Sequence, residues 1–405
     1  MIPVPEAVRI VLDAARPLEA ERVPVAEALG RVLAEDAAAD TDLPPFDRAQ
    51  MDGYAVRSQD FGEMPARLRL VGEAAAGQVF AGEVRAGEAV RIMTGAPLPA
   101  GADSVQQVEV TREEEGGDFV SVERPTAPGQ FVVPRASEVR AGTAVLFAGQ
   151  EVTAPRVAVL AAFGYAEVRV RRRPRVAVLA TGSELVGVGD RPGPGEIRDS
   201  NTYSLAAYAQ LAGACVRRLP LAGDDPALLR EAIAAAAEEA DVLVLSGGVS
   251  MGRYDYTKPA LRALGARLHF ERVALRPGKP TVFAELPGPR QVLAFGLPGN
   301  PVSVSVTFNL FARAALRAMQ GDARPTLAEE TATLARPAKG SPERASYLPA
   351  ELSTDEGGRL LAAPLKWGGS SDFVAFAQAS ALLVVPQGTK LMEAGETARV
   401  VRLPG

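Results

Sequence analysis

The spacing of apolar residues changes along the chain, and each change predicts a different region. Near the N-terminus, apolar residues at helical spacing predict helices over 5–15 and 25–33. Alternating apolar and polar residues, separated by Gly-rich and acidic turns, then predict four strands, over 68–71, 90–93, 104–110 and 119–122. A further helix among short strands is expected within 145–170. The first part of the chain therefore combines a helical start with a β-rich segment.

From residue 175 to residue 321, strand and helix patterns alternate regularly, which is typical of a doubly wound α/β domain. Strands are expected over 176–180, 216–221, 242–245, 268–273, 281–284 and 292–295. Helices are expected over 201–212, 226–240, 257–264 and 301–319. Asp225 and Asn300 each precede a proline at the first helical position, so both are predicted helix N-caps. Gly321 follows the last helix, as a C-terminal stop would.

The last part of the chain contains alternating runs without a long helical pattern, which favours a small β-barrel or sandwich. These runs cover 345–352, 359–365, 381–385 and 398–403. The run Arg171 to Arg173 before Pro174 is expected to be a solvated boundary. The resulting division has four parts: 1–45 with 141–173, a β-rich insertion over 46–140, the α/β domain over 174–325, and the barrel over 326–405.

Composition narrows the possible functions. The chain has 405 residues, 47% of them hydrophobic, and a formal net charge of −5, which argues against a general nucleic-acid binder. One cysteine, Cys215, excludes an intrachain disulfide, and one histidine, His269, excludes a zinc site of the usual ligands. His269 lies in a strand-like run, which favours an ordinary strand residue. Because no long apolar segment and no basic leader are found, we expect a soluble cytoplasmic protein that does not contact a membrane.

Candidate chemistry gathers in three loops that follow apolar runs. They read Ser-Gly-Gly-Val-Ser at 246–250, Arg-Pro-Gly-Lys-Pro at 276–280 and Leu-Pro-Gly-Asn-Pro-Val-Ser at 297–303. A fourth strand end, Thr-Gly-Ser-Glu-Leu at 181–185, and the residues 199–201 are expected to face the same crevice. Small residues, hydroxyls and backbone N–H groups at strand ends are suited to phosphates and other oxyanions.

Charged side chains accompany these loops. Glu184, Asp224 and Asp255 follow predicted strands, where carboxylates can hold Mg²⁺ together with a substrate phosphate. Lys279 lies in the second loop and Lys258 follows the first. A second group of residues surrounds Met-Asp-Gly-Tyr-Ala-Val at 51–56 and Arg-Ile-Met-Thr-Gly-Ala at 91–96, although its Asp-Gly pair fits a plain hairpin turn equally well.

All these motifs, together with Asp-Tyr-Thr-Lys at 255–258, occur in an order that resembles the MoeA family of molybdopterin molybdenumtransferases, which the E domain of gephyrin also represents. The resemblance runs nearly end to end. It implies a homodimer of four-domain subunits, in which 1–45 with 141–173 forms the linker and dimerisation domain. The α/β domain would bind molybdopterin, as in the related molybdopterin adenylyltransferases, one of which is a possible partner.

The resemblance implies that molybdenum from molybdate enters the dithiolene of adenylated molybdopterin, with Mg²⁺-dependent release of AMP. The pterin supplies both sulfurs, so the scarcity of cysteine and histidine fits this reaction. Two alternatives remain: adenylyl transfer to molybdopterin, which would use the same α/β domain, and a non-catalytic scaffold like gephyrin. The extra N-terminal and C-terminal regions favour the insertase.

By resemblance, the acidic site residues are Asp52, Glu184, Asp224 and Asp255, with Asp52 and Asp255 favoured for Mg²⁺. Asp52 and Thr94 are expected to reach the α/β domain of the partner subunit, and Lys279 to neutralise phosphate. The remaining expected substrate contacts are Thr181, Ser183, Ser246, Gly247, Gly248, Ser250, Lys258, Arg276, Pro298, Gly299, Asn300, Ser303, Arg344, Ser370 and Ser371.

Two positions depart from the family pattern. Arg276 stands where relatives commonly have lysine, so a planar fork replaces a point charge. A basic residue is expected near Pro349 but is missing, and Arg344 is the candidate substitute for contacts to molybdate.

Overall fold

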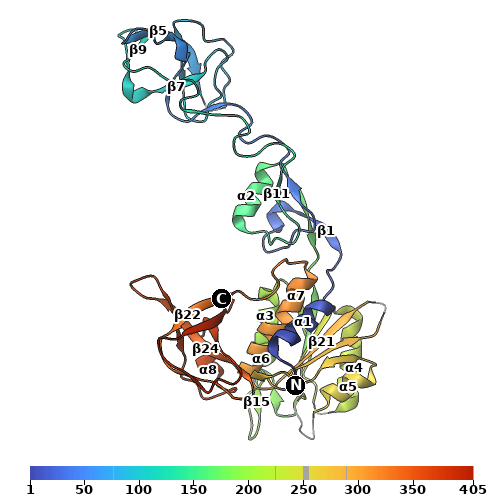
Figure 1. Ribbon diagram of the computed structural model, residues 1–405. Coiled ribbons are helices and arrows are strands. Elements are labelled where there is room, and N and C mark those ends of the chain that lie inside the picture. The colour runs from blue at the N-terminus through green and yellow to red at the C-terminus, as the bar shows by residue number, and fades with distance from the viewer. Residues whose placement is uncertain (76, 224, 250–254, 289, 405) are drawn as a thin grey trace. The chain divides into compact units, whose positions relative to one another are not determined.

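The computed structural model describes residues 1–75, 77–223, 225–249, 255–288 and 290–404 (Figure 1). The chain forms two compact units. The first contains residues 1–35, 148–157 and those from 167 onward, and the second contains residues 36–147 and 158–166. Each unit is described separately below. No helix among the described residues is long and apolar enough to cross a membrane.

The centre of the first unit is a six-stranded sheet. Its order is β16 (Cys215–Arg218), β13 (Arg175–Ala180), β17 (Val242–Ser246), β21 (Val292–Leu297), β20 (Val282–Leu286) and β18 (Arg267–Phe270). The first four strands are parallel, whereas β20 and β18 run antiparallel to their neighbours. The predicted α/β domain is confirmed, with an antiparallel pair added at one edge.

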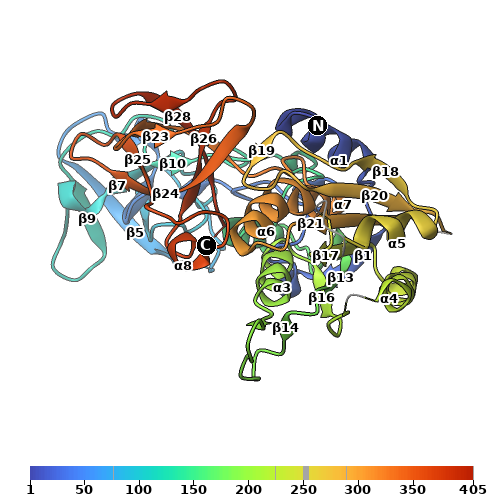
Figure 2. The same cartoon turned by 90° about the horizontal axis from the view of Figure 1, so that it is seen from below.

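Helices cover both faces of this sheet (Figures 1 and 2). One face packs against α1 (Val4–Ala14), α3 (Asn201–Leu211), α6 (Pro301–Thr307) and α7 (Arg313–Met319), and the other against α4 (Pro226–Glu239) and α5 (Thr257–Ala263). Alternate residues of a strand point to opposite faces, so Val244 joins the first core and Leu245 the second. Between α6 and α7 the helix passes through a π-helical segment, Phe308–Ala312. Continuous apolar strands such as β17 are therefore buried from both sides.

The C-terminal region of the first unit is a closed barrel of five strands. They are β22 (Glu329–Leu334), β24 (Ala345–Thr354), β25 (Leu360–Pro364), β26 (Ala381–Val385) and β28 (Thr397–Arg402). The ring closes because β24 pairs with both β25 and β26. One short strand, β19 (Leu275–Arg276), extends it by pairing with β24, and β23 (Ala338–Lys339) pairs with β27 (Leu391–Met392) as a separate two-stranded sheet. The barrel that the alternating runs favour is thus confirmed, and Tyr347 and Val384 join the core of the α/β domain.

The second unit is built around a six-stranded sheet. Its order is β7 (Ser104–Gln107), β4 (Gly53–Val56), β6 (Glu88–Ile92), β5 (Ala66–Ala74), β9 (Phe119–Val122) and β8 (Thr111–Glu113). Two short pairs accompany it, β2 (Ala37–Ala38) with β11 (Ala144–Leu146) and β3 (Arg48–Ala49) with β10 (Val132–Val133). The strands predicted from alternation all occur, except that residues 108–110 form a 3₁₀ turn.

The prediction of a helix over 25–33 is wrong. Only Val25–Glu27 is helical, as a 3₁₀ turn. The preceding β1 (Ala20–Pro24) pairs with β12 (Glu167–Arg171), and Gly30 has φ +74°, which ends any helical path. Further along, the backbone of Val32 forms a bridge in an extended conformation. Long-range pairing therefore overrides the local apolar spacing. The helix expected within 145–170 is present as α2 (Ala154–Ala162).

The arginine run at 171–173 is not the solvated boundary that the sequence suggests. The Arg172 guanidinium donates two hydrogen bonds to the Asp241 carboxylate, at 2.7 and 2.9 Å. Only 2% of the Asp241 side chain and 18% of the Arg172 side chain are exposed. Arg171 donates to the carbonyl of Leu18, 2.9 Å away. The run therefore ties segments of the first unit together.

Candidate functional site

Four chain segments meet at one edge of the central sheet. Ala180 pairs with Ser246, and Ser246 pairs with Leu297, so the parallel strands β13, β17 and β21 end side by side. The antiparallel β20 begins at this edge, because Val282 lies opposite Gly296. The loops that follow β13, β17 and β21 and the loop that precedes β20 therefore emerge together, at the edge where open α/β sheets bind ligands.

The loop after β17 needs its two glycines. Gly247 and Gly248 have φ of +92° and +63°, in a region that other residues rarely adopt. A Cβ atom on Gly247 would also lie 2.5 Å from the carbonyl oxygen of Thr181. The Thr257 hydroxyl donates to the Gly247 carbonyl at 3.1 Å, which fixes the loop against α5. The close approach of β13 and β17 loops thus depends on glycine.

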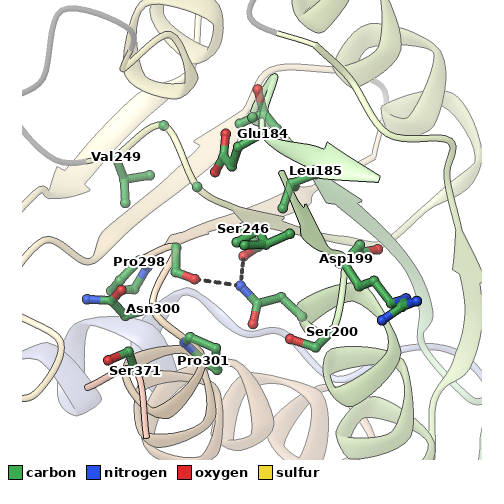
Figure 3. Close-up of a pocket in the computed structure, with 18 of the residues that line it drawn as sticks. Glu184, Leu185, Asp199, Ser200, Ser246, Val249, Pro298, Asn300, Pro301 and Ser371 are labelled. Carbon is green, nitrogen blue, oxygen red and sulfur yellow. Dashed lines mark hydrogen bonds between the residues drawn. The ribbon is translucent and has the colours of Figure 1, made fainter. Parts of the chain in front are cut away.

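A cavity of about 1000 Å³ opens above these loops (Figure 3). In the view of Figure 3, Ser246 lies between Glu184 on one side and Asn300 and Ser371 on the other. The predicted site residues that line it are Thr181, Glu184, Ser246, Gly247, Gly248, Asp255, Pro298, Gly299, Asn300 and Ser371. We refer to this space as the first cavity.

A two-stranded ribbon forms one wall of the first cavity. β14 (Leu185–Val186) and β15 (Ile197–Arg198) pair in parallel and project from the α/β domain (Figure 2). Leu185, Ile197 and Arg198 line the cavity, together with Pro192 from the connecting loop. The ribbon and its loop therefore add apolar side chains, one guanidinium and the Glu196 carboxylate to a lining otherwise rich in small residues.

Loops from distant parts of the chain are bonded together at the floor of the first cavity. The Asn201 side-chain nitrogen donates to the Ser246 hydroxyl at 2.9 Å and to the Gly299 carbonyl at 2.7 Å. Asn201 begins α3, Ser246 ends β17 and Gly299 follows β21. One side chain thus joins three of the loops.

A loop of the C-terminal domain completes the wall. Asn300 occupies the N-cap position of α6 but makes no side-chain capping bond; its amide instead donates to the Ser370 hydroxyl at 2.8 Å. The Val302 N–H donates to the Ser370 carbonyl at 3.0 Å. Asp372 accepts from the N–H groups of Gly368 (2.7 Å) and Ala375 (3.1 Å), and these bonds lower the pKa of Asp372. The loop and the short helix α8 (Phe373–Phe376) are therefore fixed against α6.

A second cavity of about 440 Å³ adjoins the first. Pro280, Pro298 and Asn300 line both cavities. The predicted site residues around the second are Arg276, Lys279, Pro298, Asn300, Ser303, Arg344 and Ser370, and Trp367 lies beside them. Three of these side chains are cationic, and no described acidic side chain lines this cavity. The second cavity is therefore suited to a small oxyanion, whereas the first has carboxylates as well as hydroxyls.

In the second unit the structure brings Asp52 and Thr94 together. The Asp52 carboxylate accepts from the Thr94 N–H at 2.6 Å and from the Thr94 hydroxyl at 2.7 Å. These two bonds, the backbone one first, lower the pKa of Asp52, so the group stays ionised. The second carboxylate oxygen accepts no hydrogen bond from the part of the chain that the structure describes. An exposed anion is thus held at a fixed place.

Comparison with known proteins covers nearly the whole chain. Residues 2–164 match the MoeA N-terminal region (domain I and II), 177–318 a probable molybdopterin binding domain, and 331–403 the MoeA C-terminal region (domain IV). The molybdopterin molybdenumtransferase of Bacillus subtilis is 37% identical over 99% of this chain and 94% of its own length. The chain belongs to the MoeA family.

Two further similar proteins support the assignment to the MoeA family. The molybdopterin molybdenumtransferase of a Nostoc species is 37% identical over 95% of this chain and 89% of its own length. A crystal structure of the MoeA protein from Pyrococcus horikoshii covers 100% of both chains with a TM-score of 0.86 at 30% identity. The fold expected from the ordered motifs is therefore confirmed.

Some of the site residues that the sequence predicts for this MoeA family member are not found in the lining of either cavity. Ser183 and Lys258 line neither cavity, although both belong to the described residues. Asp224 and Ser250 lie outside the described residues. Asp52 and Thr94 belong to the second unit.

The structure also adds residues that the motifs did not single out. Arg198 and Phe373 line the first cavity, and Trp367 lines the second. Residues 199–201, in contrast, are expected at this crevice from the sequence, and all three line the first cavity. For Phe373 the sequence shows only an apolar pair, Phe373 and Val374, whose exposure of 51% and 70% appears only in the structure.

Proposed function

We propose that this chain is a molybdopterin molybdenumtransferase of molybdenum cofactor biosynthesis. In this proposal, molybdenum from molybdate enters the dithiolene of adenylated molybdopterin and AMP is released. The observation that carries the proposal is the pair of adjoining cavities, one large with carboxylates and hydroxyls, the other small and cationic. The relatives named for this reaction support it over the whole length of the chain.

The two cavities suit the two substrates in different ways. A pterin nucleotide is large and carries phosphates, for which the glycine loops at 247–248 and 299 allow close approach to the backbone. Molybdate is a small dianion, for which Arg276, Lys279 and Arg344 supply positive charge and Ser370 a hydroxyl. The shared residues Pro280, Pro298 and Asn300 would bring the metal oxyanion next to the bound pterin.

Mg²⁺ fits the chemistry of the first cavity. Among the described residues, no group of three or more His, Cys, Asp or Glu side chains is placed to hold a metal ion, but Mg²⁺ is commonly held by only one or two carboxylates with phosphate oxygens and water. Asp255 would hold the ion from the cavity, and Asp52 would add a second carboxylate. When bound, Mg²⁺ neutralises charge that develops on the phosphates as AMP leaves. Glu184 would position substrate or accept a proton, as would Asp224.

The proposal includes a homodimer in which each site is shared. Asp52 and Thr94 of one subunit would face the α/β domain of the other, and 1–45 with 141–173 would form the linker and dimerisation domain. The fixed, ionised carboxylate of Asp52 supports this role, because an exposed anion held by two hydrogen bonds is ready to meet a cation. Cytoplasmic location and a molybdopterin adenylyltransferase as upstream partner belong to the same proposal.

The deciding experiment follows one turnover. Purified protein receives adenylated molybdopterin and Mg²⁺, with and without molybdate, and AMP release and metal-loaded cofactor are both measured. We expect metal-loaded product only with molybdate. Absence of molybdate-dependent product would refute the insertase, and formation of adenylated product from ATP and molybdopterin would favour adenylyl transfer instead.

A matched pair of lysine variants tests the second cavity. Lys279→Ala should raise the KM for molybdate about tenfold or more, because a charge-assisted contact to an anion is lost. Lys390→Ala removes an exposed lysine of the barrel that lines neither cavity, and should leave this KM unchanged. Equal effects of the two variants would show that Lys279 acts only through general surface charge.

Complementation tests the shared site. Asp52→Ala and Asp255→Ala should each keep the dimer and lose turnover. Mixing the two inactive variants should restore part of the activity, because one site of the mixed dimer then carries both carboxylates. If mixed subunits that have exchanged stay inactive, the two residues do not act across the dimer.

A further inference from the structure

One carbonyl group, that of Gly299, determines which group donates in the hydrogen bond between Asn201 and Ser246 at the floor of the first cavity. The Gly299 carbonyl can only accept, so the atom of Asn201 that lies 2.7 Å from it must be the amide nitrogen (Figure 3). The same nitrogen lies 2.9 Å from the Ser246 hydroxyl oxygen. An amide nitrogen has two hydrogens and no free acceptor site, so Ser246 must accept from Asn201.

This direction leaves the hydroxyl hydrogen of Ser246 available. Ser246 lines the first cavity although only 2% of the residue is exposed. Its carbonyl accepts from the Thr181 N–H at 3.0 Å, and within the described ranges its hydroxyl donates to no other group. A buried hydroxyl that already accepts a hydrogen bond is a stronger donor, and an anionic oxygen would be its best partner.

We propose that Asn201 is a positioning residue that holds the Ser246 hydroxyl as a hydrogen-bond donor toward a phosphate oxygen of the pterin nucleotide in the first cavity. The inference rests on the proposed function and assigns a direction to one contact of that site. The amide of Asn201 bonds through its nitrogen alone, since its buried side-chain oxygen has no partner among the described residues.

A purely structural role for Asn201 gives a different expectation. If Asn201 only joined the loops at Ser246 and Gly299, its loss would disturb the cavity whether or not Ser246 had a hydroxyl. If it acts through that hydroxyl, its loss should have little effect once the hydroxyl is gone. A double-mutant cycle separates the two roles.

The cycle measures the affinity of the full-length protein for adenylated molybdopterin. Binding is monitored by pterin fluorescence, in the absence of molybdate and with Mg²⁺ chelated. Asn201→Ala and Ser246→Ala should each weaken binding about tenfold, the loss of one hydrogen bond to a charged group. The double variant should be no more than about twofold weaker than Ser246→Ala. If the two substitutions acted independently and together weakened binding about a hundredfold, the inference would be overturned. Tight binding by Ser246→Ala would overturn it as well.

Asn201→Asp, made with and without Ser246→Ala, separates the two roles. The aspartate keeps the size of the side chain, but its ionised carboxylate accepts from Ser246 and also faces the Gly299 carbonyl. With Ser246 present, binding should fall at least as far as in Ser246→Ala and should recover as pH falls, since protonation removes the carboxylate acceptor. In the Ser246→Ala background the same substitution should change binding by no more than about twofold at any pH. An equal loss and an equal recovery in both backgrounds would contradict the proposed direction.

Gln210→Ala is the matched control, because it removes an amide from the exposed side of the same helix α3. It should bind like wild type, and thermal unfolding of all variants should be compared. Wild-type protein that binds the nucleotide but forms no metal-loaded product would refute the proposed function and leave this test intact. Wild-type protein that does not bind it would refute both.

Discussion

Replacing Arg172 by methionine should destabilise the α/β domain strongly, because it strands a buried carboxylate. Asp241 lies immediately before β17, the strand that ends at Ser246. Its side chain is 2% exposed and accepts two bonds from Arg172 and one from the Arg175 N–H, at 2.8 Å. Burial alone would raise the pKa of Asp241, but these hydrogen bonds outweigh burial and lower it.

The expected cost follows from what remains after the substitution. Breaking a buried ion pair by removing one partner costs about 3–5 kcal/mol. The Arg175 N–H would still donate to Asp241, and the Arg175 guanidinium would remain 3.7 Å away. We therefore expect the lower end, about 3 kcal/mol of unfolding free energy, which corresponds to a fall of about 1.5 M in the urea midpoint if the denaturant slope is about 2 kcal/mol/M.

Urea unfolding followed by far-UV circular dichroism measures this change. The matched control is Arg169→Met, which breaks an ion pair to Glu35 at 3.4 Å in which both side chains are 52% exposed, and should cost less than about 1 kcal/mol. A midpoint shift for Arg172→Met no larger than that of the control would refute the reasoning.

The pH dependence has a definite sign. Because the pKa of Asp241 is lowered in the folded protein, its ion pair stabilises the fold above the unfolded pKa of about 3.9, and that stability is lost as pH falls through the folded value. In Arg172→Met the stranded carboxylate is relieved by protonation. The difference between wild type and variant should therefore shrink as pH falls from about 7 toward 4, and a constant difference would contradict the assignment.

Three further predictions concern the site and the second unit. Phe373→Ala should weaken binding of adenylated molybdopterin about tenfold and Phe373→Tyr should not, if the exposed ring packs on the ligand in the first cavity; fluorescence titration measures both. Gly247→Ala should abolish most turnover while far-UV circular dichroism stays unchanged, because its Cβ would lie 2.5 Å from the Thr181 carbonyl. Burial and the Glu113 carboxylate raise the pKa of Tyr54 to about 12, so Tyr54→Phe should remove one late step from the ultraviolet tyrosine titration.

The parts of the fold that local spacing decides could be predicted from the sequence. Asp225 caps α4 through the N–H groups of Ala227 and Leu228, as its place before proline predicts. His269 lies in β18 and stacks on Phe283 with ring centroids 5.0 Å apart, which fits the ordinary strand residue favoured by its alternating run. Both outcomes depend on neighbours in the sequence or on a strong periodic pattern.

The parts that failed depend on partners far away in the chain. Arg172 resembles a surface arginine until Asp241, 69 residues later, is placed beside it. Asn300 has the sequence of a capping residue, yet its amide bonds to Ser370, 70 residues later. Neither partner can be recognised from local spacing, because a salt bridge or a side-chain hydrogen bond can join two matching groups however far apart they lie in the sequence. The same limit explains why motifs located the glycine loops and missed the direction of the Asn201 bonds.

The bonds between α6 and the loop at 368–372 have a consequence for how this protein could be re-engineered. Two hydrogen bonds to Ser370 hold the barrel against the α/β domain, and Ser370, Trp367 and Arg344 supply one side of the second cavity. The other side comes from Arg276 and Lys279. If the second cavity binds the metal oxyanion as proposed, a chimera that takes its barrel from a relative with another metal preference should inherit the Ser370, Trp367 and Arg344 side of that cavity, and with it the Ser371 and Phe373 part of the first cavity.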